Sequence, residues 1–165
     1  MIIKIILTVI LCTIANLLQS TLLGKIAILN VVPDLALCIL VYSAYVNGTM
    51  PGQISGFFSG ISLDLLSAAP LGLNGLVRTL VGALAGLFKG MFFLDSVFMP
   101  VILCILATLV KAIILLLLNL IFGPAVPSYS FISAVFWLEL GMNAVLSPFL
   151  FMLLKKIKPL SPGRR

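Results

Sequence analysis

Four ionisable side chains lie inside long apolar stretches of the sequence: Asp64, Arg78, Lys111 and Glu139. A charge in the apolar interior of a membrane is costly and seldom lacks a partner. Such residues indicate either a proton or ion relay, a polar substrate site, or structural ion pairs that fix the register of helices. Two acids and two bases permit complete mutual pairing.

The positions of these residues along the expected helices predict which residues form ion pairs. Asp64 lies about five residues before the end of one apolar stretch and Arg78 about four residues into the next, so both are roughly 6 to 8 Å deep. Lys111 and Glu139 lie in the last two stretches, and a flexible lysine side chain can close the remaining difference in depth. We therefore expect Asp64 to pair with Arg78 and Lys111 with Glu139. Structural pairs are favoured over a relay, because the sequence offers no further polar track across the bilayer.

The composition requires a membrane for these helices. The 165 residues are 62% hydrophobic and 8% charged, with a mean hydropathy of +1.34, whereas soluble domains are typically about half apolar and a quarter charged. At roughly 20 apolar residues per span, the chain holds at most about six helices. The predicted fold is an all-α integral membrane protein with about six transmembrane helices in one bundle.

Breakers and turn residues divide the apolar sequence into six predicted spans. The spans are residues 5–23, 33–46, 52–68, 74–88, 97–122 and 131–154, followed by a basic tail at 155–165. Proline at a first turn and an acid at the positive helix end suit Pro33 and Asp34 to begin the second span.

The basic residues predict the orientation. With six spans, one side collects Lys4, Lys89 and the five tail bases, and Lys25 lies opposite. The positive-inside rule then places both termini in the cytoplasm, and the tail is expected to contact anionic lipid. The formal charge of +6 does not indicate nucleic-acid binding, because the bases are not laid out on a solvent-facing groove. The tail bases are Lys155, Lys156, Lys158, Arg164 and Arg165.

Small residues at four-residue spacing predict close helix packing. They occur at Gly52, Gly56 and Gly60, and again at Gly82, Gly86 and Gly90. The first span carries a comparable polar and small stripe, which should face protein and not lipid; its members are Thr8, Cys12, Asn16 and Ser20. The packing is either internal or against another membrane subunit.

Catalytic chemistry finds no support in the sequence. Histidine is absent, and no nucleophile arrangement, phosphate-cradling glycine loop or zinc spacing is present. Cys12, Cys38 and Cys104 each lie in an apolar run and are expected to act as small hydrophobes. We expect no enzyme activity, no cofactor and no metal.

An ordered set of motifs between residues 33 and 86 resembles the bacterial rod shape-determining MreD family. The set is Pro33-Asp34-Leu35, Gly56-Phe57 with Gly60, Leu63-Asp64-Leu65-Leu66, Pro70-Leu71-Gly72-Leu73, and Val81-Gly82 with Gly86. The resemblance implies a non-enzymatic, multi-pass scaffold subunit of the cell-elongation machinery (the elongasome) in the bacterial cytoplasmic membrane. It implies as partners a bitopic MreC-like protein, an actin-like MreB homologue, and the glycosyltransferase and transpeptidase of lateral peptidoglycan synthesis.

The resemblance also implies a second candidate function, because the family is similar in fold to the substrate-binding subunits of energy-coupling-factor vitamin transporters. A vitamin binder needs an outward-facing pocket with several polar or aromatic groups. The expected outer ends offer a thin set for that purpose: Asn74, Ser128, Tyr129 and Trp137. The turn from Pro70 to Leu73, held by the expected Asp64–Arg78 pair, is instead a candidate docking corner for a partner outside the membrane.

Overall fold

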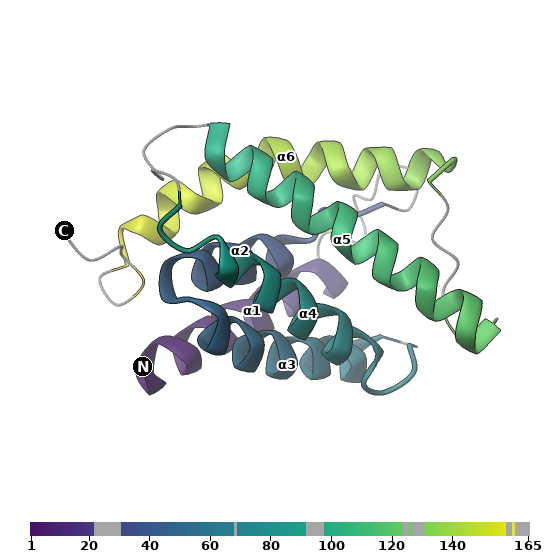
Figure 1. Ribbon diagram of the computed structural model, residues 1–165, viewed down its shortest axis with the longest axis horizontal. Coiled ribbons are helices and arrows are strands. Elements are labelled where there is room, and N and C mark those ends of the chain that lie inside the picture. The colour runs from purple at the N-terminus through teal and green to yellow at the C-terminus, as the bar shows by residue number, and fades with distance from the viewer. Residues whose placement is uncertain are drawn as a thin grey trace.

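The computed structural model describes residues 1–21, 31–67, 69–91, 98–123, 126, 131–157 and 160. This part of the chain forms six helices and confirms the predicted all-α fold (Figure 1). In chain order the helices are α1 (Ile2–Thr21), α2 (Leu35–Asn47), α3 (Thr49–Leu66), α4 (Leu73–Leu87), α5 (Phe98–Phe122) and α6 (Ala134–Lys155).

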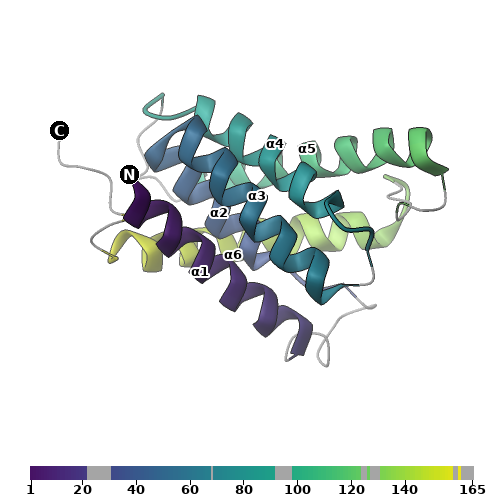
Figure 2. The ribbon, with the colours of Figure 1, turned by 90° about the horizontal axis from the view of Figure 1, so that it is seen from below.

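The short helix α2 forms the centre of the bundle. Every residue from Ala36 to Tyr45 is buried, and α2 contacts each of the other five helices. Figures 1 and 2 show α5 and α6 on one side of it and α1 with α3 on the other. An apolar sequence without amphipathic periodicity suits this position, because a helix enclosed on all sides needs no polar face.

Among the described residues, three helices are long and apolar enough, by length and composition, to cross a membrane: α1, α5 and α6. The 13 residues of α2 extend only about 20 Å at 1.5 Å per residue, less than the roughly 30 Å of bilayer hydrocarbon. A helix of that length does not span the hydrocarbon layer by itself. The other helices bury α2 on every side, which makes the short length tolerable.

Local signals place the helix ends. Asp34 caps α2 by accepting a hydrogen bond from Leu37 N at 3.0 Å, and Ser133 Oγ accepts from Phe136 N at the start of α6. Gly48 joins α2 to α3 in one residue with φ of 104°, a conformation that favours glycine. That tight connection makes α2 and α3 antiparallel neighbours.

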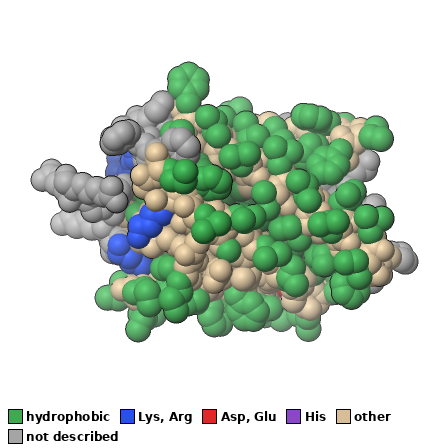
Figure 3. All heavy atoms as spheres, in the orientation of Figure 1, with side chains coloured by type: hydrophobic (Ala, Val, Ile, Leu, Met, Phe, Trp, Pro, Cys, Tyr) green, Lys and Arg blue, Asp and Glu red, His purple; other side chains and the backbone are tan. Residues whose placement is uncertain are grey.

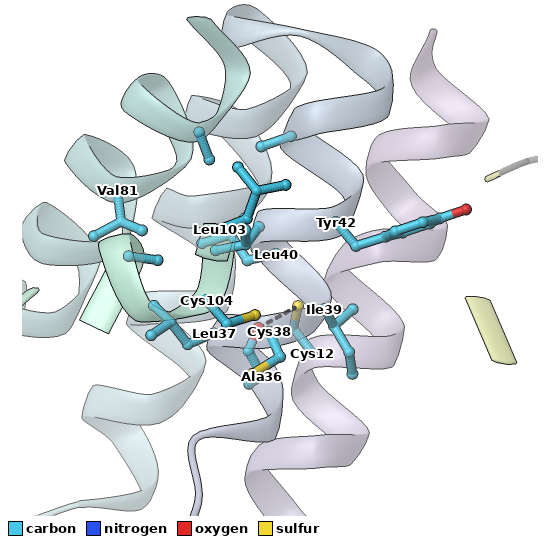
Figure 4. Close-up of a cluster of buried hydrophobic side chains, with 14 of the residues drawn as sticks. Cys12, Ala36, Leu37, Cys38, Ile39, Leu40, Tyr42, Val81, Leu103 and Cys104 are labelled. Carbon is cyan, nitrogen blue, oxygen red and sulfur yellow. Dashed lines mark hydrogen bonds between the residues drawn. The ribbon is translucent and has the colours of Figure 1, made fainter. Parts of the chain in front are cut away.

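Buried thiols contribute to the core around α2. Cys12, Cys38 and Cys104 come from α1, α2 and α5, and all three are free and buried. Figure 4 shows them among the apolar side chains, with Cys12 Sγ donating to Ala36 O at 3.5 Å. They pack as small hydrophobes, as the sequence indicated.

The two ends of the bundle differ in charge. The start of α1 and the ends of α4 and α6 lie at one end, with Lys4, Lys89, Lys155 and Lys156. Figure 3 shows the visible basic side chains gathered at this end and hydrophobic side chains covering most of the remaining face. We call it the basic end.

Candidate functional site: a buried charge network joining six helices

Asp34 is the centre of a buried ionic network. Its Oδ1 accepts from Arg78 Nη2 at 2.9 Å and its Oδ2 from Lys111 Nζ at 2.9 Å. Its backbone N–H donates to Asn143 Oδ1 at 2.8 Å, while Oδ1 also caps α2 at Leu37. Asp34 thus joins α2 to α4 and α5 through its carboxylate and to α6 through its backbone N–H.

Lys111 continues the network to Glu139, as the sequence predicted for this pair. Lys111 Nζ lies 2.7 Å from Glu139 Oε1. The charges therefore alternate along the series Arg78, Asp34, Lys111, Glu139 and sum to zero. Neutrality with short, charge-assisted contacts offsets the desolvation of four ions.

Arg78 extends the network to α1 and α3. Its Nη1 donates to Asn16 Oδ1 at 3.1 Å and to Ser59 O at 3.3 Å. The Asn16 amide in turn donates to Ser59 O at 3.1 Å and to Ser62 Oγ at 3.0 Å. Asn16 and Arg78 are almost fully buried.

The polar stripe predicted on the first span faces protein at Thr8, Cys12 and Asn16. The expectation for Ser20 is wrong, since Ser20 is exposed.

The amide of Asn143 completes the set. Its Oδ1 accepts from the Asp34 backbone, and its Nδ2 donates to Thr108 Oγ1 on α5 at 3.1 Å. Each of the six helices thereby contributes at least one side-chain or backbone group, α2 through the Asp34 cap. A polar layer of this kind specifies one helix arrangement, because a displaced helix would leave a charge without its partner.

The expected Asp64–Arg78 pair is wrong. Arg78 reaches Asp34 instead, and Asp64 accepts hydrogen bonds from the backbone N–H groups at the start of α4: Gly72 at 2.9 Å, Asn74 at 3.0 Å and Gly75 at 3.2 Å. The Asn74 amide adds a fourth bond at 2.8 Å. The first N–H groups of a helix have no partner within the helix, so a carboxylate from α3 satisfies them and complements the helix dipole.

Asp34 was predicted only as the acid at the positive end of the second span, so its role as a counter-ion was missed. The relevant signal is the short distance in sequence from Asp34 to the Asn47–Gly48 turn. Only about 20 Å of helix fits between them. A helix too short to span the apolar layer can begin inside it, and an acid at such a position requires cationic partners.

Glycines bring α3 and α4 into backbone contact. A Cβ added at Gly56 would overlap the carbonyl of Arg78, and one at Gly60 would overlap that of Asn74. Gly52 and Gly82 face each other's carbonyl oxygens, and Gly86 faces Thr49. The predicted small-residue faces therefore meet within this chain. The placement of Gly90 is corrected, because it lies beyond the end of α4 with φ of 75°.

Most remaining motif positions belong to the ends of the same hairpin and to the start of α2. Pro33 O accepts from Gln19 Nε2 at 2.6 Å. Gly72 adopts the left-handed conformation with φ of 93°, and Leu71 is 74% exposed beside Pro70. This turn is therefore a rigid corner held by Asp64, with an apolar side chain on its surface.

The other expected outer-end groups are either engaged or outside the described residues. Asn74 is bonded to Asp64, and Trp137 Nε1 donates to Phe131 O at 3.0 Å. Residues 128 and 129 lie outside the described part of the chain, as do Lys25, Lys158, Arg164 and Arg165. Among the described tail residues, Leu160 is fully buried, and its carbonyl accepts from Tyr42 Oη at 3.1 Å.

The arrangement favours a structural function for the network. Each of its four ions has an oppositely charged atom within 2.9 Å. One turn toward the basic end, Asn16 and Asp34 give way to Cys12 and Cys38 of the apolar cluster in Figure 4. A proton relay would need an unbroken series of polar groups, and this apolar layer separates the network from the Thr8–Ser43 hydrogen bond nearer the basic end. Among the described residues, no group of three or more histidine, cysteine, aspartate or glutamate side chains is placed to hold a metal ion.

Comparison with known proteins assigns the chain to a family. The family model for the rod shape-determining protein MreD matches residues 1–157. The match includes α1, α5 and α6, beyond the motif-bearing stretch from 33 to 86, and so covers every member of the network. Comparison with curated proteins and with solved structures gives no match.

Proposed function

Since the chain belongs to the rod shape-determining MreD family, we propose that this membrane protein is a non-enzymatic scaffold subunit of the bacterial cell-elongation complex. Its family places it in rod shape determination. The scaffold assignment goes further, and one observation carries it. Hydrogen bonds extend the internally neutralised charge network to all six helices, and this favours a fixed bundle over one built around a transported ion.

A fixed body with almost no extramembrane mass offers partners its lipid-facing helix surfaces, its turns and its basic end. We propose a bitopic MreC-like protein as the partner within and outside the membrane, and an MreB-like actin homologue at the basic end. The peptidoglycan glycosyltransferase and transpeptidase would join through the same assembly. The lysines at one end support a cytoplasmic, anionic-lipid-facing orientation for both termini by the positive-inside rule.

The Pro70–Gly72 corner is the proposed docking point on the outer side. Asp64 holds the backbone there with three N–H contacts, and Leu71 projects with 74% of its surface exposed. A preorganised turn loses little conformational freedom on binding, and an exposed leucine supplies apolar area to a partner.

The test is affinity purification of the tagged full chain from its native membrane in mild detergent, followed by mass spectrometry of the co-eluting proteins. Recovery of an MreC-like protein with cell-wall synthases is expected. Recovery of an energising membrane subunit with paired ATPases would overturn the scaffold assignment in favour of vitamin uptake.

A matched pair of variants tests the corner. Leu71→Ser changes the outer turn, and Met91→Ser changes another exposed apolar residue, 63% exposed against 74% for Leu71, just past α4. Leu71→Ser should reduce recovery of the MreC-like protein, and Met91→Ser should not reduce it. Equal recovery with both variants would exclude the corner as the docking point.

A further inference from the structure

The buried charge network consists of two neutral halves that belong to different parts of the bundle. Arg78 and Asp34 pair within a four-helix unit formed by α1, α2, α3 and α4. Lys111 and Glu139 pair within the hairpin formed by α5 and α6. Each part therefore holds one cation and one anion of the network in direct contact. We call the boundary between the four-helix unit and the α5–α6 hairpin the seam.

Two polar contacts of the network cross the seam. Lys111 Nζ lies 2.9 Å from Asp34 Oδ2, and the Asp34 backbone N–H donates to Asn143 Oδ1 at 2.8 Å. If one helix of the network moved alone, a buried charge would lose its partner. If α5 and α6 move together, Lys111 keeps Glu139, and Asp34 keeps Arg78. Opening at the seam therefore avoids the large cost of leaving an ion unpaired in an apolar medium.

The packing at the seam is also less close than the packing inside the four-helix unit. Helices α3 and α4 are in backbone contact at Gly56 and Gly60. Helices α4 and α5 meet through apolar side chains, and a small recess remains between them beside Ala85 and Ala107. In a membrane, lipid covers apolar faces that separate, so lost packing and lost polar contacts make up most of the cost. The seam is therefore a weaker interface than the one between α3 and α4.

We propose that the α5–α6 hairpin detaches from the four-helix unit as one body, with the Lys111–Asp34 bridge as its latch, more readily than the four-helix unit itself opens. Figures 1 and 2 show α5 and α6 together on one side of α2. The closed arrangement is the resting state, and detachment exposes the side of α2 that packs against the hairpin. The proposal concerns the isolated chain, so its test does not depend on the scaffold assignment or on any partner.

The native cysteines lie where they can report this opening. Cys38 on α2 and Cys104 on α5 interact with each other across the seam (Figure 4). Cys12 lies inside the four-helix unit, where its Sγ donates to Ala36 O. All three cysteines are 0–1% exposed, so the closed arrangement shields each of them from a thiol reagent.

The test is N-ethylmaleimide labelling of the purified full chain in detergent, followed by mass spectrometry of the peptide that contains each cysteine. Each rate is divided by the rate of the same cysteine in the denatured chain. In wild type, Cys38 and Cys104 should react several-fold faster than Cys12, because opening at the seam exposes them and leaves Cys12 enclosed. Equal relative rates for the three cysteines, or a faster rate for Cys12, would overturn the proposal.

A latch variant tests the role of the bridge. Lys111→Met combined with Glu139→Gln removes the bridge and leaves both parts neutral. Labelling of Cys38 and Cys104 should become about ten-fold faster, the effect of losing one hydrogen bond between charged groups, while labelling of Cys12 should not change. Unchanged labelling at all three positions, or an equal increase at Cys12, would overturn the proposal. The wild-type rates decide the question if this variant does not fold.

A matched variant inside the four-helix unit is the control. Thr8→Val combined with Ser43→Ala removes a buried hydrogen bond between α1 and α2 and leaves the seam intact. It should leave the labelling of Cys104 unchanged. An increase at Cys104 as large as that in the latch variant would show that any buried polar change loosens the hairpin, and would exclude the bridge as a specific latch.

Discussion

Arg78 of α4 lies 2.9 Å from Asp34 at the start of α2, although 44 residues separate them in sequence. Asp34 is shared with Lys111 of α5. A single carboxylate therefore neutralises two cations from two helices, and each cation has a second polar partner. This makes Asp34 the residue on which the arrangement of the helices depends most.

Replacing Asp34 with alanine should cause the largest loss of stability. The change leaves two buried cations without their shared counter-ion, which typically costs about 3–5 kcal/mol, and removes the α2 cap as well. Thermal unfolding in detergent, followed by the loss of the monodisperse chromatographic peak, measures the effect. Asp34→Asn keeps a capping side chain and should lie between alanine and wild type. Lys156→Ala at the exposed end of α6 is the control. Equal midpoints for Asp34→Ala and this control would contradict the assigned network.

The glycine interface gives a prediction with an internal control. A methyl group at position 56 meets the backbone of Arg78, whereas one at position 141 meets nothing within 4 Å. Gly56→Ala should therefore destabilise the protein by about 1–3 kcal/mol through overpacking. Gly141→Ala should be neutral or stabilise it by up to about 1 kcal/mol, because alanine is the better helix former. The same direction of change in both variants would argue against backbone contact between α3 and α4.

The cap that Asp64 provides predicts a local effect at the outer turn. Asparagine at this position retains one acceptor oxygen but directs an NH₂ group at backbone donors, so Asp64→Asn should cost about 1–3 kcal/mol. Cleavage at the turn between α3 and α4 should also become faster in limited proteolysis. Leu65→Ala, at a 72% exposed position next to Asp64, serves as the comparison. An unchanged cleavage rate in Asp64→Asn would show that the carboxylate does not hold the turn.

Leu160, a described residue beyond the end of α6, is predicted to be an anchor point on the bundle. It is fully buried, and Tyr42, which bonds its carbonyl, also packs edge-on against Phe151 at 5.0 Å. Leu160→Ala should free this part of the chain and accelerate tryptic cleavage after Lys155 and Lys156. The matched change Leu153→Ala, at a 60% exposed position, should leave cleavage unchanged. Equal cleavage of both variants would exclude the anchor.

The helices and the class of the protein follow from the sequence because they depend on local properties. Runs of apolar residues, with glycine and proline between them, predict six helices and a membrane environment without knowledge of their packing. The Lys111–Glu139 contact was also within reach, since both residues lie at similar depth in consecutive antiparallel spans. The glycine faces at Gly56 and Gly82 are likewise visible as a four-residue repeat, because a repeat near the helical period defines one face.

The choice of partners required the tertiary structure. Asp64 and Arg78 lie at similar depth, but the N–H groups at the start of α4 compete for Asp64. Asp34 reaches Arg78 from α2, and the depth of a residue does not predict which helices are neighbours. The central position of α2 also required the tertiary structure, since neighbouring helices bury it on every side. Depth is one coordinate that a sequence supplies, while ion pairing also depends on the rotation and lateral position of each helix. Those two coordinates are determined by packing among all six helices together.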